Sequence, residues 1–515
     1  MRIPVFLGTV LALLVPGVAS ATTYQVGPTA DHPDVQSLMQ SVTLAAGDVV
    51  EVEGDHLYPG DLWLREEAQG EPGNPIVFRG LRKNGQRPRL QGVGTEQWHD
   101  MVVFLAGNHM VFEGFEIIGD DDTSHSCIIT QGDDIVIRDV WVHGCAGQGI
   151  LATDWGTGDL TIEYSEFSDN GSGNFYHSIY VTTDQDLYPG SRVRIQFNYV
   201  HDLSGGLAIK SRAERGEVYF NWIEGAPLNA LDLIGPDADA DDAREDTDVV
   251  GNVIYYDGIY AAARIGDDGT NGTDGRYRFA YNTFVIDGPG VVFRPQVNID
   301  ALEVYNNVFI ALNGATPRMY DEVEYSGTPP VVMGSHNFIG AAFTAIPSEF
   351  TETLTGEPGL ADPAGFDFRP VEGSLLIDAG TTSPFGPERA LPNPLTQLDY
   401  VPPPRVDAPA GMPYARNPNG MPDIGAYAFG SGTEPGPGGP PPSGGGSGGS
   451  SSAGGGGADG PSDGSDADDD WRDRDDGCHL SRTPGRHGTG GSGGEMAVIA
   501  ALGLAAASRR RRARG

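Results

Sequence analysis

Lysine is almost absent from the sequence: Lys83 and Lys210 are the only two, and arginine supplies the other permanent cations. Acidic residues outnumber lysine and arginine by 71 to 32, so the formal net charge at pH 7 is −39. A chain this acidic repels phosphate groups, which excludes nucleic acid as a partner. Residues 22–430 also lack the Gly-x-Ser-x-Gly, His-Glu-x-x-His, phosphate-loop and Cys-x-x-Cys motifs. Their absence argues against serine hydrolase, zinc protease, nucleotide hydrolase and dithiol chemistry.

Long apolar runs are also lacking, and the first of two short ones lies at the N-terminus. Residues 1–21 contain Arg2, an apolar run over Val5–Val15 and the small-residue end Ala19-Ser20-Ala21. This order is typical of a secretory signal peptide, and cleavage is expected after Ala21. The run is too short to cross a bilayer. The sequence therefore predicts export, with a mature protein that begins near residue 22.

The C-terminal end is also a processing segment. Residues 431–477 are rich in Gly, Ser, Pro and Asp and predict a disordered linker. Cys478 follows, and residues 478–515 continue with a short apolar stretch and an arginine cluster. This order resembles the myxobacterial MYXO-CTERM sorting signal. The resemblance implies cleavage by a processing protease near Cys478 and delivery to the outer surface of a Gram-negative cell, or release. A plain single-span anchor is the alternative.

The region between the two ends is built from repeats. A short strand pattern recurs every 23 to 33 residues, with no helical periodicity between the copies. Such repeats indicate an all-β solenoid, a right-handed single-stranded parallel β-helix. Asparagine recurs at one place in the later copies, where we expect it to adopt the left-handed conformation of a tight bend and to stack in a side-chain ladder. These asparagines are Asn198, Asn221, Asn252, Asn282, Asn306 and Asn337.

A second strand pattern follows each asparagine pattern by about ten residues and alternates apolar with other residues. The period of two places one set of side chains in the core and the other on the outer face. The predicted inward set is Ile179, Val181, Leu207, Ile209, Leu231 and Leu233. The predicted outward set is Tyr180, Thr182, Ala208, Lys210 and Asp232.

The boundaries of the solenoid follow from the fading of the repeats. Residues 22–345 are assigned to the β-helix, with one amphipathic helix over Val35–Val42 near its start, and residues 346–430 to a closing segment. The early helix resembles the cap of pectate-lyase-like β-helices, which covers the open end of the core. We expect a monomer.

Lys210 is the first candidate for chemistry. The residues around it resemble the Lys-Ser motif of chondroitinase-B-like and alginate-lyase polysaccharide lyases, where the lysine is the base. The resemblance implies β-elimination on a uronate, with Arg212 or Arg264 neutralising the carboxylate and Arg294 binding nearby. This chain departs from the pattern at Asp232, where those lyases have an arginine, and Asp232 is itself a candidate substrate-binding residue. The structural alternative is that Lys210 only forms an ion pair with Asp232 or Glu214.

Histidine and aromatic residues form the second set of candidates. His177, Tyr180 and His201 could act as acid or base, because they lie on or next to the repeat that carries Lys210. Tyr176 and Trp222 are expected at the surface, where they could stack on sugar rings. Ordinary packing and hydrogen bonds at bends are the alternative for each residue.

Metal and disulfide candidates complete the set. The acidic loop after Gly235 spaces carboxylates as Ca²⁺ sites do, and a solvated acidic loop is the alternative. Its candidate ligands are Asp237, Asp239, Asp241 and Asp242. Cys127 and Cys145 could pair in an oxidising compartment, or remain as two buried thiols.

These observations predict an exported, surface-anchored β-helix that binds extracellular polysaccharide. Processing of that polysaccharide is left open. An active uronate lyase with Lys210 as its base is one alternative. A non-catalytic adhesion or matrix protein is the other.

Overall fold

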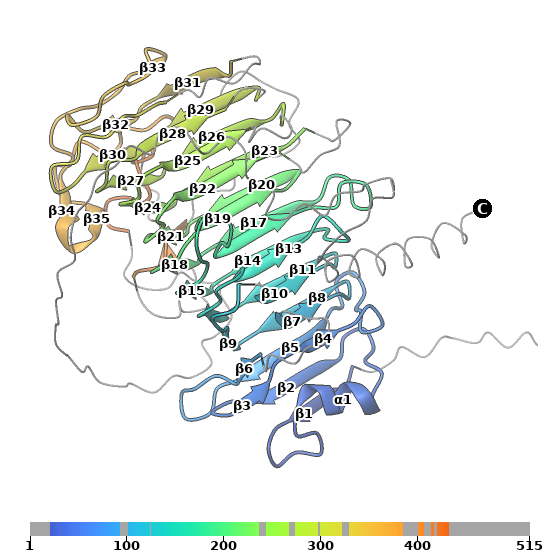
Figure 1. Ribbon diagram of the computed structural model, residues 1–515. Coiled ribbons are helices and arrows are strands. Elements are labelled where there is room, and N and C mark those ends of the chain that lie inside the picture. Colours follow the sequence, from blue (N-terminus) through green and yellow to red (C-terminus); the bar gives the residue numbers. More distant parts are fainter. Residues whose placement is uncertain are drawn as a thin grey trace, which may run out of the picture.

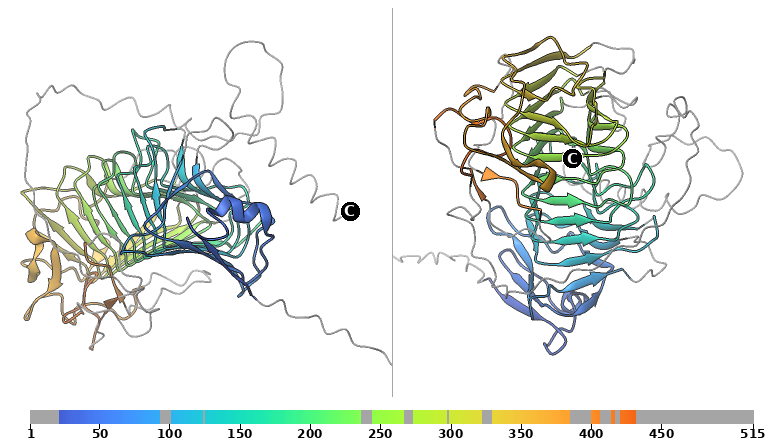
Figure 2. Two further views of the ribbon diagram at one scale, coloured as in Figure 1. Left: turned by 90° about the horizontal axis from the view of Figure 1, so that it is seen from below. Right: turned by 90° about the vertical axis from the view of Figure 1, so that its left-hand side faces the viewer.

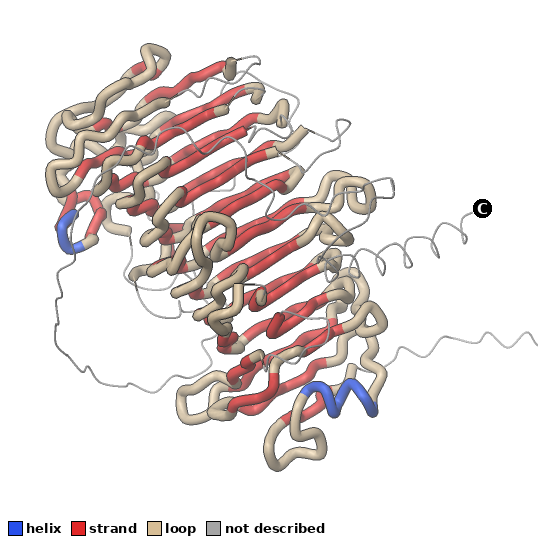
Figure 3. Tube along the Cα trace, in the orientation of Figure 1, coloured by secondary structure: helices blue, strands red, loops and turns tan. Residues whose placement is uncertain are grey.

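The computed structural model describes residues 21–92, 101–123, 125–235, 244–266, 273–296, 299–321, 329–384, 400–405, 414–416 and 420–431. In this part of the chain, short strands stack into three parallel sheets along one axis, as Figure 1 shows, and Figure 3 shows how little helix accompanies them. The fold is the right-handed parallel β-helix that the repeats predict. Residues 1–20, residues 432–515 and the acidic loop at 237–242 lie outside the described residues, and with them nearly all of both processing segments.

Sheet A has 13 strands, sheet B has 11 and sheet C has 9, counted in the described residues. Sheet A consists of β1 (Thr23–Val26), β2 (Val49–Glu53), β5 (Ile76–Leu81), β8 (Met110–Glu113), β11 (Ile135–Arg138), β14 (Leu160–Glu163), β17 (Arg192–Gln196), β20 (Arg215–Tyr219), β23 (Asp246–Val250), β26 (Arg276–Ala280), β29 (Ala301–Tyr305), β31 (Val331–Ser335) and β33 (Phe350–Thr351). Sheet B consists of β3 (Leu57–Pro59), β6 (Arg89–Gln91), β9 (Glu116–Ile118), β12 (Trp141–His143), β15 (Glu166–Ser168), β18 (Tyr199–His201), β21 (Trp222–Ile223), β24 (Val253–Tyr256), β27 (Thr283–Ile286), β30 (Val308–Ala311) and β32 (Phe338–Ile339). Sheet C consists of β4 (Leu62–Leu64), β7 (Met101–Leu105), β10 (Ser126–Thr130), β13 (Ile150–Ala152), β16 (Ile179–Thr182), β19 (Ile209–Arg212), β22 (Asn229–Ile234), β25 (Ala261–Gly266) and β28 (Val291–Pro295).

The predicted helix near the start is present as α1 (Val35–Ser41). The Asp34 carboxylate accepts a hydrogen bond from the Ser37 backbone N–H at 2.7 Å and caps the first turn. Val35 and Leu38 are buried in the core cluster, so the apolar face of α1 covers the first turn of the solenoid. Figures 1 and 2 show α1 at the N-terminal end of the stack.

The asparagine ladder is confirmed, with two corrections. From Asn221 onward, each ladder Oδ1 accepts the backbone N–H of the ladder asparagine one turn earlier, as Asn252 does from Asn221 at 2.8 Å, and Asn198 accepts from Ser165 at the start of the ladder. In the turn that contains both Asn306 and Asn307, the ladder residue is Asn307, because its Oδ1 accepts a hydrogen bond from the Asn282 backbone N–H. The bend itself is taken by the residue before each ladder asparagine, such as Phe220 at φ 55°. The prediction that the ladder asparagines are left-handed was therefore wrong.

The predicted inward set is nearly all confirmed. Ile179, Val181, Ile209, Leu231 and Leu233 lie in the main core cluster. Leu207 and Ala208 depart from their predicted places. Ala208 was predicted outward, but it is fully buried in the main core cluster, and Leu207 was predicted inward, but it lies outside that cluster. Strand β19 begins only at Ile209, so the alternation of a strand does not extend back to these two residues.

The closing segment packs on the outer face of sheet B. It contains two short antiparallel pairs, β34 (Leu360–Asp362) with β35 (Asp367–Pro370), joined by the 3-10 turn Pro363–Gly365, and β36 (Tyr400–Val401) with β37 (Tyr414–Ala415). Ile424 and Ala426 share a buried cluster with Val253 and Val285 of sheet B. Among the described residues no helix has the length and apolar character needed to cross a membrane.

Candidate functional site

One column of side chains on the outer face of sheet C holds most of the candidate residues. Tyr180, Lys210, Asp232, Arg264 and Arg294 are direct register partners on the consecutive strands β16, β19, β22, β25 and β28. Neighbouring strands lie about 4.8 Å apart, so these residues are neighbours in the column although up to 114 residues separate them in sequence. The fold therefore places four charged groups and a phenol in one row.

Asp232 and Arg264 form the central ion pair of this column. The Asp232 carboxylate is fully buried and receives two hydrogen bonds from the Arg264 guanidinium, at 2.5 Å from Nε and 2.8 Å from Nη2. Bidentate pairs of this kind hold both side chains in one geometry. Asp232, where the sequence departs from the lyase pattern, thus orients Arg264 at the surface.

Tyr180 connects Lys210 with Arg212. The Lys210 ammonium lies 4.9 Å from the centre of the Tyr180 ring, and Arg212 Nε donates a hydrogen bond to the Tyr180 hydroxyl at 3.2 Å. Arg212 is only 4% exposed and its Nη1 also donates to the Gly235 carbonyl. Arg212 therefore supports the phenol from within, and Lys210, which is partly exposed, is the cation of this pair that faces solvent.

His177 lies beside the column and is 3% exposed. Its Nδ1 accepts a hydrogen bond from the Leu207 backbone N–H at 3.2 Å, so the proton of the neutral ring is on Nε2. Burial lowers the pKa of His177 well below its ordinary value, and the charges of Lys210, Arg264 and Arg212 lower it further. His177 is therefore a neutral imidazole at physiological pH.

One aromatic residue that contacts the column was missed by sequence reasoning. Tyr260 precedes β25, and the Arg294 guanidinium stacks over its ring at 4.2 Å. The sequence did not predict this contact, because Tyr260 lies in a turn, where the alternation of a strand does not apply. Tyr176 is partly exposed in the loop before β16.

His201 and Trp222 lie on sheet B and not on the face that carries Lys210. His201, on β18, bonds to Glu166 at 3.2 Å and to Asp202 at 2.8 Å. Trp222 is 2% exposed, because Phe368 of the closing segment packs against it with ring centres 5.8 Å apart. The expectation that Trp222 lies at the surface was wrong. Sheet B also holds residues that the sequence did not single out, including the buried carboxylates of Glu166 and Glu224.

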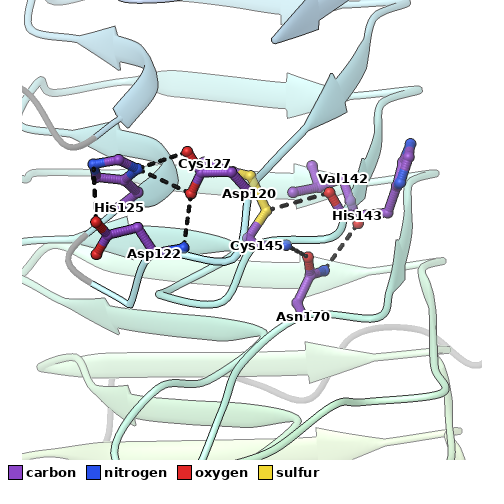
Figure 4. The surroundings of a disulfide bond; sticks show 8 residues. All are labelled: Asp120, Asp122, His125, Cys127, Val142, His143, Cys145 and Asn170. Carbon is purple, nitrogen blue, oxygen red and sulfur yellow. Dashed lines mark hydrogen bonds and ion pairs between the residues drawn. A yellow bond between two sulfur atoms is a disulfide. The ribbon is translucent and has the colours of Figure 1, made fainter. Parts of the chain in front are cut away.

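Cys127 and Cys145 form a disulfide, shown in Figure 4. The bond joins strand β10 of sheet C to the bend after β12 of sheet B. The Asn170 side chain accepts a hydrogen bond from the Cys145 backbone N–H at 3.2 Å and fixes the same bend. No group of three or more side chains suited to hold a metal ion is present in the described ranges.

We expect His177 and His201 to give opposite pH dependences of stability. Burial opposes charge on His201, but its hydrogen bonds with Glu166 and Asp202 outweigh burial and raise its pKa. The stabilisation from His201 is therefore present below an unfolded pKa of about 6.5 and is lost as pH rises through the folded value. His177 has a lowered pKa, so its stabilisation is present above about pH 6.5 and is lost as pH falls.

Urea unfolding of His177→Gln and His201→Gln at pH 5 and pH 8 tests this difference. His201→Gln should destabilise the protein more at pH 5, and His177→Gln more at pH 8. Equal losses at both pH values for either variant would contradict the assignment for that histidine.

No protein-family model and no curated protein matches this chain. Among solved structures, it is similar to pectate lyase Pel9A, with a TM-score of 0.49 and 13% identity over 80% of this chain and 98% of that one. A rhamnogalacturonan lyase gives a TM-score of 0.40 and 13% identity over 62% and 87% of the two chains. An alginate lyase from Paenibacillus sp. str. FPU-7 gives 0.37 and 14% over 65% and 95%. Identity this low leaves the role of each residue to be argued from this chain itself.

Proposed function

We propose that this chain is an exported β-helix protein that binds acidic extracellular polysaccharide on the outer face of sheet C. The observation that carries the proposal is the column of Lys210, Asp232, Arg264 and Arg294 on four consecutive strands. Lys210 and Arg264 lie two strands apart, about 9.6 Å, and Arg264 and Arg294 one strand apart, about 4.8 Å, which suits carboxylates carried at intervals on an extended chain. The Asp232 clamp orients Arg264 before a ligand arrives, which lowers the entropy cost of binding.

Export to the cell surface is part of the proposal. The signal-like residues 1–21 support it, and so does the Cys127–Cys145 disulfide, because disulfides persist in oxidising compartments. The linker, Cys478 and the arginine cluster support sorting to the outer surface by a protease that cleaves near Cys478. We further propose that Ca²⁺ binds the acidic loop at Asp237, Asp239, Asp241 and Asp242, because carboxylate oxygens are the ligands that Ca²⁺ prefers.

β-Elimination on a uronate is the second candidate function, and the contacts of Tyr180 favour it. Lys210 would remove the proton on the carbon next to the carboxylate, and the electron pair would form a double bond as the bond to the leaving sugar oxygen breaks. The Tyr180 hydroxyl, which already accepts a hydrogen bond from Arg212, would give its proton to that oxygen. Arg264 would stabilise the negative charge that develops on the carboxylate.

Binding to a panel of polyuronates and sulfated glycans, with and without a chelator, tests the proposal. Lys210→Ala should weaken binding of an acidic glycan roughly tenfold to a hundredfold, because a hydrogen bond to a charged group contributes about 1.5–3 kcal/mol. Lys83→Ala is the matched control. It removes the other lysine of the chain, which pairs with Glu53 at a side-chain exposure of 54%, and it should leave binding unchanged.

The same incubations separate the two functions. Growth of the near-ultraviolet absorbance of an unsaturated uronate, lost in Lys210→Ala and Tyr180→Phe, supports the lyase. Retained binding with no absorbance change on any substrate supports a non-catalytic glycan-binding protein. Failure of every acidic glycan to bind the native protein would reject the proposal, and loss of binding in chelator would support a Ca²⁺ site.

A further inference from the structure

The column that contains Lys210 continues in the opposite direction with a different character. Beyond Tyr180 its register partners are Leu151, Ile129, Phe104 and Trp63, on β13, β10, β7 and β4. All four side chains are partly exposed. One half of the row is therefore apolar and aromatic, and the other half is charged.

The apolar half is not part of the core. The inward-facing residues of the same strands fill the interior, and Leu64, Val103, Ile128 and Ile150 are all fully buried there. The two aromatic rings at the end of the column lie side by side, with the centres of Trp63 and Phe104 5.5 Å apart. The Arg65 guanidinium lies 4.8 Å over the Trp63 ring and flanks this end.

The length of the column suits a polymer and not a single small ligand. Nine strands form sheet C, and at a spacing of about 4.8 Å they extend the row over about 38 Å. A glycan bound at Lys210 and Arg264 that follows the strands in both directions meets cations on one side and apolar side chains on the other. A carboxylate placed over Leu151 or Ile129 would lose water without gaining a partner, which is costly.

The net charge of the chain limits how many acidic sugars can bind in the column. The chain carries a net charge of −39, which repels a densely anionic polymer outside the short cationic row. Within that row, Asp232 already neutralises one of the cations through its pair with Arg264. Few acidic sugars can therefore be matched at one time.

We infer that the sheet C column takes a heteropolysaccharide in which one or two acidic sugars adjoin a run of neutral sugars. The acidic sugars lie at Lys210, Arg264 and Arg294, and the apolar faces of the neutral sugars lie against Leu151, Phe104 and Trp63. This inference rests on the proposed function and adds the charge pattern of the ligand. It also gives the ligand a direction along the solenoid, from neutral at the N-terminal end to acidic at the C-terminal end.

Titration calorimetry of the full exported protein with three soluble polymers tests the inference. The probes are a homopolyuronate, a heteropolysaccharide whose uronates are separated by neutral sugars, and a neutral polymer. The native protein should bind the heteropolysaccharide at least tenfold more tightly than the homopolyuronate. Trp63→Ala and Phe104→Ala should each weaken heteropolysaccharide binding roughly fivefold to thirtyfold and leave the homopolyuronate unchanged.

Three control variants separate loss of an aromatic ring in the column from loss of folding and from loss of a tryptophan elsewhere. Trp63→Leu and Phe104→Leu keep an apolar side chain on the strand, so they separate loss of the ring from loss of folding. Trp141→Ala removes a partly exposed tryptophan from sheet B and should change no affinity. Equal or tighter binding of the homopolyuronate, or unchanged heteropolysaccharide affinity in both ring variants, would overturn the inference while leaving the proposed function in place. Self-association of the native protein that Trp63→Ala abolishes would make the apolar half an interface between copies, which also overturns it.

Discussion

Asn252→Ala is expected to lower the free energy of unfolding by about 3–5 kcal/mol, because several buried hydrogen bonds would lose a partner. The Asn252 side chain accepts from the backbone and side-chain amides of Asn221, at 2.8 and 3.0 Å, and donates to the Val218 carbonyl at 2.8 Å. All of these groups lie in the core, where water cannot replace the lost partner. Equilibrium unfolding in urea measures the change.

Asn84→Ala is the control for the ladder. Asn84 bonds to Asp55 at an exposed turn and has a left-handed backbone at φ 51°, so its replacement by alanine should cost about 1–2 kcal/mol, mostly from the backbone. Leucine at position 252, which matches asparagine in size but offers no amide, should destabilise the protein at least as much as alanine. A loss for Asn252→Ala as small as that for Asn84→Ala would mean that the ladder does not hold the turns together.

Asp232→Asn is expected to destabilise the protein by about 2–3 kcal/mol, because the partly exposed Arg264 guanidinium loses its counter-charge and one of its two hydrogen bonds. Asp232 is fully buried and binds Arg264 through two hydrogen bonds, whereas asparagine can accept through one oxygen only. The same substitution removes one negative charge from the column. Asparagine still accepts one hydrogen bond from Arg264, so we expect the gain from the lost repulsion to outweigh the looser clamp and the folded variant to bind an acidic glycan more tightly. Urea unfolding measures the stability loss, and calorimetry measures the affinity.

Two further variants test whether loss of the Asp232–Arg264 ion pair causes the drop in stability. Asp186→Asn removes an exposed carboxylate from the loop after β16 and should leave both stability and affinity unchanged. The double variant Asp232→Asn/Arg264→Gln should lose less stability than the two single variants together, because neither partner is then left charged and unpaired. Additive losses in the double variant would show that the two side chains do not act as a pair.

Much of the fold follows from short-range patterns. Recurring strands with asparagine at one place predicted the solenoid, because a ladder asparagine must occupy the same position in every turn to reach its neighbours. Alternation with a period of two correctly placed Lys210 outward and Leu231 inward. The alternation failed at Ala208, where the chain is not yet a strand. The asparagine pattern failed at Asn306, because the adjacent Asn307 is the ladder member.

The candidate site was predicted less completely, because contacts between turns depend on register. The loops that join the sheets differ in length from turn to turn, so spacing along the chain does not show which side chains become neighbours. The bidentate pairing of Asp232 with Arg264 and the contact of Arg294 with Tyr260 both cross between strands in this way. His201 is close to Lys210 in sequence, yet the intervening bend places it on another sheet.

The sequence by itself determined the class of fold, the inward and outward faces of the strands and the shortage of lysine that drew attention to Lys210. Alternation and repeat spacing act within one turn or between adjacent turns, so they can be read along the chain. Only the tertiary structure decided which outward residues join one column, and it alone showed that this column changes from apolar to charged along sheet C. It also decided that Trp222 is covered, since the closing segment that buries it comes from far along the chain. Long-range packing of this kind leaves no periodic trace in the sequence.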